Sequence, residues 1–243
     1  MNELSYVNGA SAKQLLGETI GNNLKTIVEK FPNREALVSV HQNYRATYLA
    51  FYQQTTAVAK ALLAHKVYNG DRVGIWAPNC YEWTLLQFAT ARIGAILVNL
   101  NPAYRAHEVS FAINQSETKL VVSATQFKKS DYKQMLTLVR EDCPSLKEII
   151  YLNEDWNAFL KVGEQITDDY LAREVENVQF DDAVNIQYTS GTTGFPKGVT
   201  LSHHNILNNG YFIGERLHYT ENDRECIPVP FYHCFGMVIV NMA

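Results

Sequence analysis

No apolar run in this 243-residue sequence approaches the ~20 residues that a helix needs to cross a bilayer. The first 23 residues also lack the basic and apolar segments that make up a secretory signal. We therefore expect a cytoplasmic protein, and a peripheral contact with a membrane stays open.

Cysteine is scarce, with four in the chain, and no two of them form a Cys-x-x-Cys pair. Their spacing matches neither a zinc site nor a disulfide framework. We interpret them as small buried apolar side chains in a reducing compartment. Cys234 stands apart because it lies beside a histidine and several aromatic residues.

Positive charge is not in excess either, since 21 Lys and Arg face 25 Asp and Glu, for a net charge of -4. A nucleic-acid-binding chain would carry a basic patch. The nearest candidate is the pair Lys128 and Lys129, which is typical of a solvated surface. We therefore expect no nucleic-acid partner.

Strand and helix patterns alternate along most of the chain. Short apolar runs predict buried strands at residues 73–76, 95–98, 120–122 and 149–151, with helical spacing between them. This alternation predicts an α/β fold with layered, largely parallel sheets and flanking helices. The acid-rich stretch 154–182 shows no clear period. We interpret it as a boundary between a first α/β subdomain, residues 1–170, and the start of a second, residues 171–243.

The strongest motif follows a predicted strand at residues 183–188 and runs from Thr189 to Lys197. Its glycines let backbone N–H groups approach an anion, its hydroxyls can donate to phosphate oxygens, and Lys197 adds a positive charge. The order matches neither a Walker A loop nor Gly-x-Gly-x-x-Gly. A flexible polar surface loop is the alternative, but the position between two strand-like runs favours phosphate binding.

A second informative block spans residues 228–237. Pro228 and Pro230 hold the chain extended, and aromatic residues, a histidine and a glycine follow. From the residues alone, this block is either a buried loop with a structural histidine or a substrate-binding loop. Between the two motifs, Ser202 or Asn205 is a candidate helix cap.

Two adjacent histidines, His203 and His204, follow the first motif. On a helix they point in different directions and cannot form an i, i+4 metal pair. We expect both to be structural or surface residues.

The loop at 189–197 resembles the signature loop of the AMP-binding, adenylate-forming superfamily, which includes acyl- and aryl-CoA ligases. The resemblance extends from about residue 24 to the end of the chain and implies the large N-terminal domain of such an enzyme. In that family the loop folds over the β- and γ-phosphates of ATP. It implies an ATP-binding set in which Lys197 is the catalytic cation and Ser190 or Thr192 enters the Mg²⁺ shell: Thr189, Ser190, Gly191, Thr192, Thr193, Gly194, Phe195, Pro196 and Lys197.

The second block resembles the family's substrate motif, and its residue sequence is most similar to that of fatty-acyl members. The resemblance implies that His233 is catalytic, beside the acyl carboxylate and the α-phosphate. It also implies a substrate pocket formed by Phe231, Tyr232, His233, Phe235 and Gly236. The implied reaction converts a fatty acid and ATP to acyl-AMP and pyrophosphate, after which the thiol of coenzyme A displaces AMP.

The family's adenine motif, ribose aspartate and C-terminal lysine domain all follow the point where this sequence stops. The sequence also stops within an apolar run, residues 235–243. We therefore expect the front part of a fatty-acid–CoA ligase that is inactive alone. Two alternatives stay open: a non-catalytic binding or interaction module, and a ligase for an aryl acid.

Overall fold

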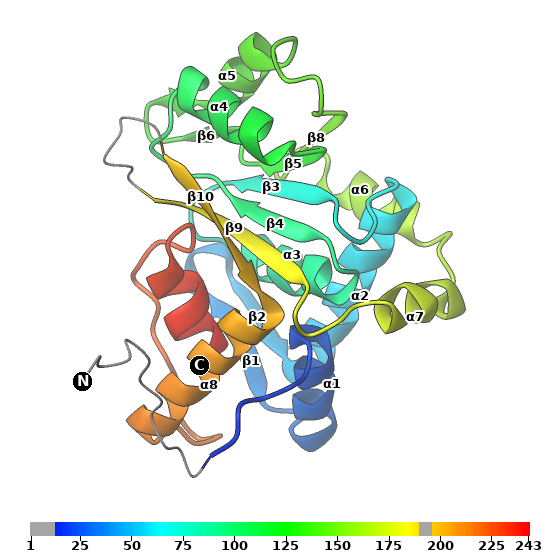
Figure 1. Ribbon diagram of the computed structural model, residues 1–243, viewed down its shortest axis with the longest axis vertical. Helices are drawn as coiled ribbons and strands as arrows, with labels where there is room; N and C mark the ends of the chain where they lie inside the picture. Colours follow the sequence, from blue (N-terminus) through cyan, green and yellow to red (C-terminus); the bar gives the residue numbers. More distant parts are fainter. Residues whose placement is uncertain (1–12, 190–195) are drawn as a thin grey trace, which may run out of the picture.

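A six-stranded sheet lies at the centre of the computed structural model, which describes residues 13–189 and 196–243 (Figure 1). The strand order is β10-β9-β4-β3-β5-β8. The strands are β3 (Arg72–Trp76), β4 (Ile96–Asn99), β5 (Leu120–Ser123), β8 (Glu148–Tyr151), β9 (Ala183–Thr189) and β10 (Lys197–Ser202). The four strands predicted from apolar runs are confirmed, and they pair in parallel within this sheet.

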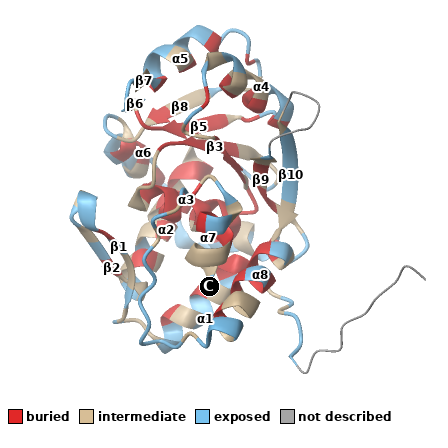
Figure 2. Ribbon diagram, turned by 90° about the vertical axis from the view of Figure 1, so that its left-hand side faces the viewer, coloured by how far each residue is buried: buried red, intermediate tan, exposed pale blue. Residues whose placement is uncertain are grey.

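The burial of the strands explains why they could be predicted from the sequence. A parallel sheet is covered on both faces, so its strands are continuously apolar. Every residue of β5 is buried, as are four of the five in β3. The edge strand β10 differs, because it pairs antiparallel with β9 and most of its residues are exposed (Figure 2).

Helices cover both faces of the sheet (Figure 1). On one face, α1, α2 and α3 pack against one another and α6 packs against α2; on the other, α4 packs against α5. Their bounds are α1 (Ile20–Lys30), α2 (Tyr48–Ala64), α3 (Tyr81–Arg92), α4 (Ala106–Ser116), α5 (Tyr132–Val139) and α6 (Trp156–Gly163). The predicted α/β layering is therefore confirmed.

The stretch without clear period, residues 154–182, is more regular than the sequence indicated. It contains α6 and a further helix, α7 (Asp168–Glu176). Both are short, and the buried apolar residues of α6, Trp156 and Phe159, are too few to establish a period. The proposed division into subdomains at residue 170 stays a prediction.

In the part of the chain that the structure describes, two hairpins lie outside the main sheet. The first joins β1 (Glu35–Ser39) to β2 (Tyr44–Thr47) through a 3-10 turn at Val40–Gln42. It is held to α3 by the stacked rings of Tyr44 and Tyr81, whose centroids lie 3.9 Å apart. The second is small and joins β6 (Gln126–Phe127) to β7 (Ser130–Asp131).

The helix after β10, α8 (His203–Leu217), begins at a reciprocal cap. Ser202 accepts from the backbone of Asn205, and the Asn205 side chain accepts from the backbone of Ser202. The predicted cap is therefore confirmed. A short π-helical segment, η2 (Phe235–Val240), packs against α8 and contains most of the apolar run at the end of the chain.

The four cysteines are all free but are not all buried. Cys143 is buried and Cys226 is exposed, while Cys80 and Cys234 are partly covered. The prediction of buried thiols is therefore wrong for Cys226. Within the described residues, no helix combines the length and apolarity that a membrane span requires.

The chain path creates a switch point between β4 and β9. From the carboxyl end of β4 the chain crosses to β5 on the far side of β3, whereas from β9 it turns outward to β10. The two parallel neighbours thus send their following loops in opposite directions from their carboxyl ends. Open α/β sheets bind ligands at such points.

Candidate functional site

The phosphate motif connects β9 to β10 at this edge of the sheet. Lys197 pairs with Thr189 and Gly198 with Tyr188 in the antiparallel register. Both Thr189 and Lys197 are exposed, and Pro196 is partly covered. The Tyr188 hydroxyl donates to the Ala112 carbonyl at 2.9 Å, which anchors the end of β9 to α4. The other predicted loop residues, Ser190 to Phe195, lie outside the described residues.

The histidine block, residues 228–237, docks on the same edge of the sheet. Asn79, in the loop after β3, donates to the Val229 carbonyl and accepts from the Phe231 N–H, both at 2.8 Å. Asn99 ends β4, and its amide lies 3.4 Å from the carbonyls of Phe231 and Tyr232. The fold therefore places two motifs that are about 40 residues apart in the sequence at the carboxyl ends of the neighbouring strands β4 and β9.

A second row of amides supports the first. Asn185 on β9 donates to the Leu97 carbonyl at 2.8 Å and to Asn99 Oδ1 at 3.0 Å. Asn99 also lies 3.1 Å from Met237 Sδ. Asn99 and Asn185 are almost fully buried, and buried amides hold their position when they are hydrogen-bonded. The histidine block is thus fixed to β4 through Asn99, and Asn185 of β9 bonds to Asn99 in turn. The sequence analysis gave neither side chain a chemical role.

His233 is exposed, and one of its ring nitrogens is already engaged. Its Nδ1 accepts from the backbone N–H of Phe235 at 3.2 Å. In neutral imidazole one nitrogen accepts and the other donates, so this bond places the proton on Nε2. His233 can therefore offer an N–H group to an anion without first being protonated.

The other predicted pocket residues have different surroundings. Phe231 is buried against Trp83 and lines a cavity of about 700 Å³ between the β1–β2 hairpin, the loop after β3 and residues 219–227. Tyr232 is partly covered, and Phe235 is 47% exposed. Gly236 has a packing role, because a Cβ there would lie 2.5 Å from the Pro230 carbonyl oxygen. A side chain at 236 would displace that backbone.

Tyrosines near the edge of the sheet were missed by sequence reasoning. Burial raises the pKa of Tyr104 to about 12, with smaller contributions from Glu108, Tyr188 and Tyr232. Burial also raises the pKa of Tyr188. Both phenols therefore stay protonated at neutral pH. The available signal was their position, since Tyr104 follows the strand at 95–98 and Tyr188 ends the strand before the phosphate motif.

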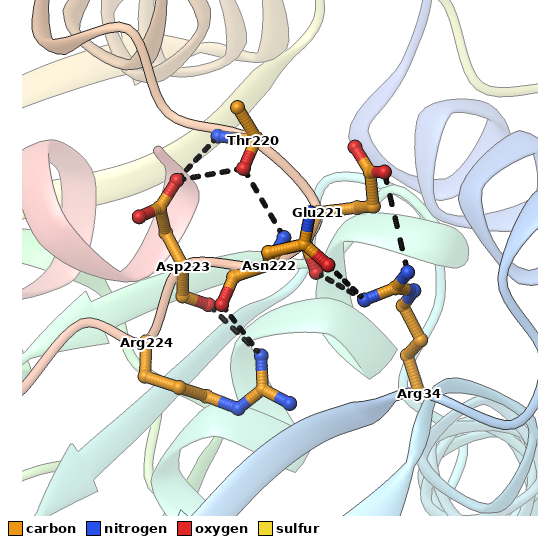
Figure 3. Close-up of polar contacts among 6 residues, drawn as sticks. All are labelled: Arg34, Thr220, Glu221, Asn222, Asp223 and Arg224. Atoms are coloured by element: carbon orange, nitrogen blue, oxygen red, sulfur yellow. Dashed lines mark hydrogen bonds and ion pairs between the residues drawn. The ribbon is translucent and has the colours of Figure 1, made fainter.

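The connection from α8 to the histidine block is a polar turn at residues 220–224 (Figure 3). Arg34 donates to the Glu221 carbonyl at 2.7 Å and to Asn222 Oδ1 at 3.0 Å. Asp223 accepts from the N–H and the hydroxyl of Thr220, at 2.7 and 2.9 Å. The chain is thus restrained before the histidine block by Arg34, and the block itself is held by Asn79 and Asn99.

The donor groups at the end of the β9–β10 hairpin suit an anion. Lys197 offers a charge and Thr189 a hydroxyl, the groups that bind phosphate oxygens. Across residues 13–189 and 196–243, no group of three His, Cys, Asp or Glu side chains could hold a metal ion.

Residues 24–243 match the AMP-binding enzyme family. The chain belongs to this family. Two relatives of this chain are the mitochondrial medium-chain acyl-CoA ligases ACSF2 of Danio rerio and Homo sapiens. They are 42% and 36% identical over 258 and 263 residues, which cover 96% and 98% of this chain. Those alignments cover 42% and 43% of the relatives, so the chain spans less than half of their length.

A solved structure gives the same result for the fold of this chain. The long-chain-fatty-acid-CoA ligase FadD1 of Archaeoglobus fulgidus superposes with a TM-score of 0.83 at 23% identity. The match covers 99% of this chain and 47% of that protein. The mostly parallel sheet with flanking helices is thus that of the N-terminal domain of adenylate-forming enzymes, as predicted.

Proposed function

We propose that this chain binds ATP and a fatty acid as the front part of an AMP-forming acid–CoA ligase. The observation that carries the proposal is the meeting of two motifs at the β4–β9 switch point. The β9–β10 hairpin supplies Lys197 and Thr189 at the carboxyl end of β9, and Asn99 anchors the histidine block at the carboxyl end of the neighbouring strand β4. Family membership supports adenylation as the chemistry.

In the proposed reaction the fatty-acid carboxylate attacks the α-phosphorus of ATP, and the bond to pyrophosphate breaks. Acyl-AMP and pyrophosphate result, and the coenzyme A thiol then displaces AMP to give the thioester. Phosphoryl and nucleotidyl transfers of this kind depend mainly on positioning and charge stabilisation. We assign charge stabilisation at the β- and γ-phosphates to Lys197 and the loop at 189–197. Mg²⁺ would neutralise phosphate charge, with Ser190 or Thr192 in its shell.

We assign His233 to the anionic centre of the reaction. Its Nε2–H would donate to the substrate carboxylate or to an α-phosphate oxygen, since Nδ1 is engaged by Phe235. Donors held in place before the reaction stabilise developing charge more than water can. Phe231, Tyr232 and Phe235 would shape the acyl pocket, with Gly236 allowing the close backbone approach behind them.

The acid itself is inferred from the relatives, two of which are named as medium-chain acyl-CoA ligases. We propose a medium-chain fatty acid as the substrate. We also propose that the chain alone does not complete the reaction, because it spans 42% of the first of these relatives. The cytoplasmic location and a peripheral membrane contact stay predictions.

The proposal is tested by titrating the purified chain with MgATP, pyrophosphate, decanoate, palmitate and benzoate in a calorimeter. We expect saturable binding of MgATP and pyrophosphate, and tighter binding of decanoate than of benzoate. A chain that binds no nucleotide and no pyrophosphate would contradict the proposal and favour the non-catalytic module. A preference for benzoate would indicate an aryl-acid ligase.

A further inference from the structure

We propose that Asn79 is a positioning residue of the ligase, which orients the His233 imidazole by holding the backbone of the histidine block. Asn79 does not touch the reacting atoms in this proposal. The inference rests on the function proposed for His233, but its structural part can be tested without that function.

One side-chain amide makes both contacts of a strand partner. Asn79 Nδ2 donates to the Val229 carbonyl and Asn79 Oδ1 accepts from the Phe231 N–H, each at 2.8 Å. The two contacts bracket Pro230, which has no N–H of its own to offer. The planar side-chain amide of Asn79 both donates and accepts. It therefore fixes the position and the orientation of the backbone at residues 229–231 relative to the loop after β3.

The Pro230 carbonyl transmits this constraint to the turn that follows. It accepts from the backbone N–H of His233 at 3.2 Å. Gly236 returns to the same carbonyl, so closely that a Cβ would lie 2.5 Å from its oxygen. Both ends of the turn that carries His233 thus contact the residue clamped by Asn79.

The turn at residues 233–236 determines which ring nitrogen of His233 carries the proton. The Phe235 N–H donates to His233 Nδ1 at 3.2 Å, and Gly236 N–H donates to the His233 carbonyl at 3.0 Å. A displaced turn would free Nδ1 and allow the proton to exchange between the two nitrogens. The Nε2–H group would then be neither fixed in direction nor always present.

The second contact to the block, from Asn99, is weaker by geometry. Its amide lies 3.4 Å from the carbonyls of Phe231 and Tyr232, beyond the usual 2.7–3.2 Å range of an N–H···O bond. Of the two asparagines, Asn79 therefore makes the better-formed hydrogen bonds to the backbone of the block. Aspartate at 79 would accept from the Phe231 N–H but would face the Val229 carbonyl with a second acceptor.

The structural test uses the isotope-labelled chain and two variants, Asn79→Ala and Asn79→Asp. In Asn79→Ala we expect roughly tenfold faster hydrogen exchange at the Phe231 amide, as the loss of one well-formed bond produces. The His233 ring nitrogen shifts should move from the Nε2–H tautomer toward a mixture. In Asn79→Asp the Phe231 amide should stay better protected from hydrogen exchange than in Asn79→Ala. His233 should still change from the single Nε2–H tautomer to a mixture.

The matched control is Asn114→Ala. It removes an exposed hydrogen bond from the Asn114 side-chain amide to the Asp142 carbonyl, and both residues are far from the histidine block in sequence. It should leave both the Phe231 exchange rate and the His233 shifts unchanged. Unchanged values in Asn79→Ala, or equal changes in the control, would overturn the proposal. If Asn79→Ala does not fold, the tautomer of Asn79→Asp decides.

The functional arm measures two affinities of the same proteins. We expect Asn79→Ala to weaken decanoate binding by about tenfold and to leave pyrophosphate affinity within about twofold, because pyrophosphate is assigned to the untouched phosphate hairpin and has no α-phosphate for His233 to contact. Equal losses for both ligands would indicate a general structural effect and contradict a positioning role. If the parent chain binds neither ligand, the proposed function fails. The hydrogen exchange of the Phe231 amide and the ring nitrogen shifts of His233 still test whether Asn79 positions the histidine block.

Discussion

Lys197 lies directly opposite Thr189 in the antiparallel pairing of β9 and β10. The loop between them therefore leaves and re-enters the sheet at one point, with a cation and a hydroxyl side by side. That point is the carboxyl end of β9, next to β4. An anion bound there would meet both groups at once.

Replacing this cation should weaken phosphate binding selectively. We expect Lys197→Ala to reduce the affinity of the chain for pyrophosphate by roughly tenfold to a hundredfold, since hydrogen bonds to charged groups contribute about 1.5–3 kcal/mol. Because Lys197 is exposed, the loss should shrink as salt is added. Calorimetric titration at two ionic strengths measures both effects. Lys161→Ala, an exposed lysine on α6, is the control, and an equal loss there would refute the assignment.

Phe235 and Gly236 are neighbours that should respond differently to substitution. Phe235 is 47% exposed, so Phe235→Ala should change the relative affinities for decanoate and palmitate with little effect on the melting temperature. Gly236→Ala should lower the melting temperature by several degrees, because its Cβ would lie 2.5 Å from the Pro230 oxygen. Thermal melts and fatty-acid titrations separate the two. An unchanged acyl preference in Phe235→Ala would remove Phe235 from the pocket.

His203 should make the chain less stable in mild acid. The side chain is fully buried, and its Nδ1 accepts from the Ile20 N–H at 3.2 Å. Burial lowers its pKa from 6.5 to about 4, against a smaller opposing effect of Asp182. The unfolded chain therefore binds this proton first as the pH falls. Stability is fully present above pH 6.5 and is lost between 6.5 and about 4, by a maximum on the order of 3 kcal/mol.

Urea unfolding at a series of pH values tests this prediction. The slope of unfolding free energy against pH should be shallower in His203→Gln than in the parent chain. His204→Gln is the control, because His204 is only partly covered and lies against the Phe180 ring. Identical slopes in the parent chain and in His203→Gln would show that His203 does not carry the effect.

The chain by itself should not form acyl-CoA. It spans 42% of the Danio rerio relative, and positioning of the reacting groups can contribute about 7–11 kcal/mol of barrier lowering. We expect no thioester from the chain with ATP, Mg²⁺, coenzyme A and decanoate, measured by chromatography. Sustained turnover that is abolished by Lys197→Ala would prove the chain a complete catalyst and refute this prediction.

Much of the fold could be predicted because its strands are buried on both faces. Residues 73–76 and 120–122 are apolar without interruption, and both lie in the centre of the sheet. The helices α6 and α7 could not be predicted in the same way. Each is fewer than three turns long, so its apolar residues repeat at helical spacing over two turns at most.

Motif order in the sequence identified the candidate phosphate and histidine segments, including Lys197 and His233. Those segments could be named because their residue types are chemically suited to anions wherever they lie. Their proximity could not be read from the sequence, since it depends on the parallel pairing of β4 with β9. The neutral tautomer of His233 depends likewise on a turn that only the folded backbone defines.

Local composition thus determined the α/β class, the strand positions, the phosphate motif and the Ser202 cap, because each depends on residues close together in the chain. Tertiary structure alone decided that Asn79 and Asn99 contact the histidine block, that Asn185 bonds to Asn99, and that Gly236 must be glycine. A lone asparagine has no sequence signature. Its role arises when a polar side chain at a strand end meets the unpaired backbone of a segment some 150 residues away.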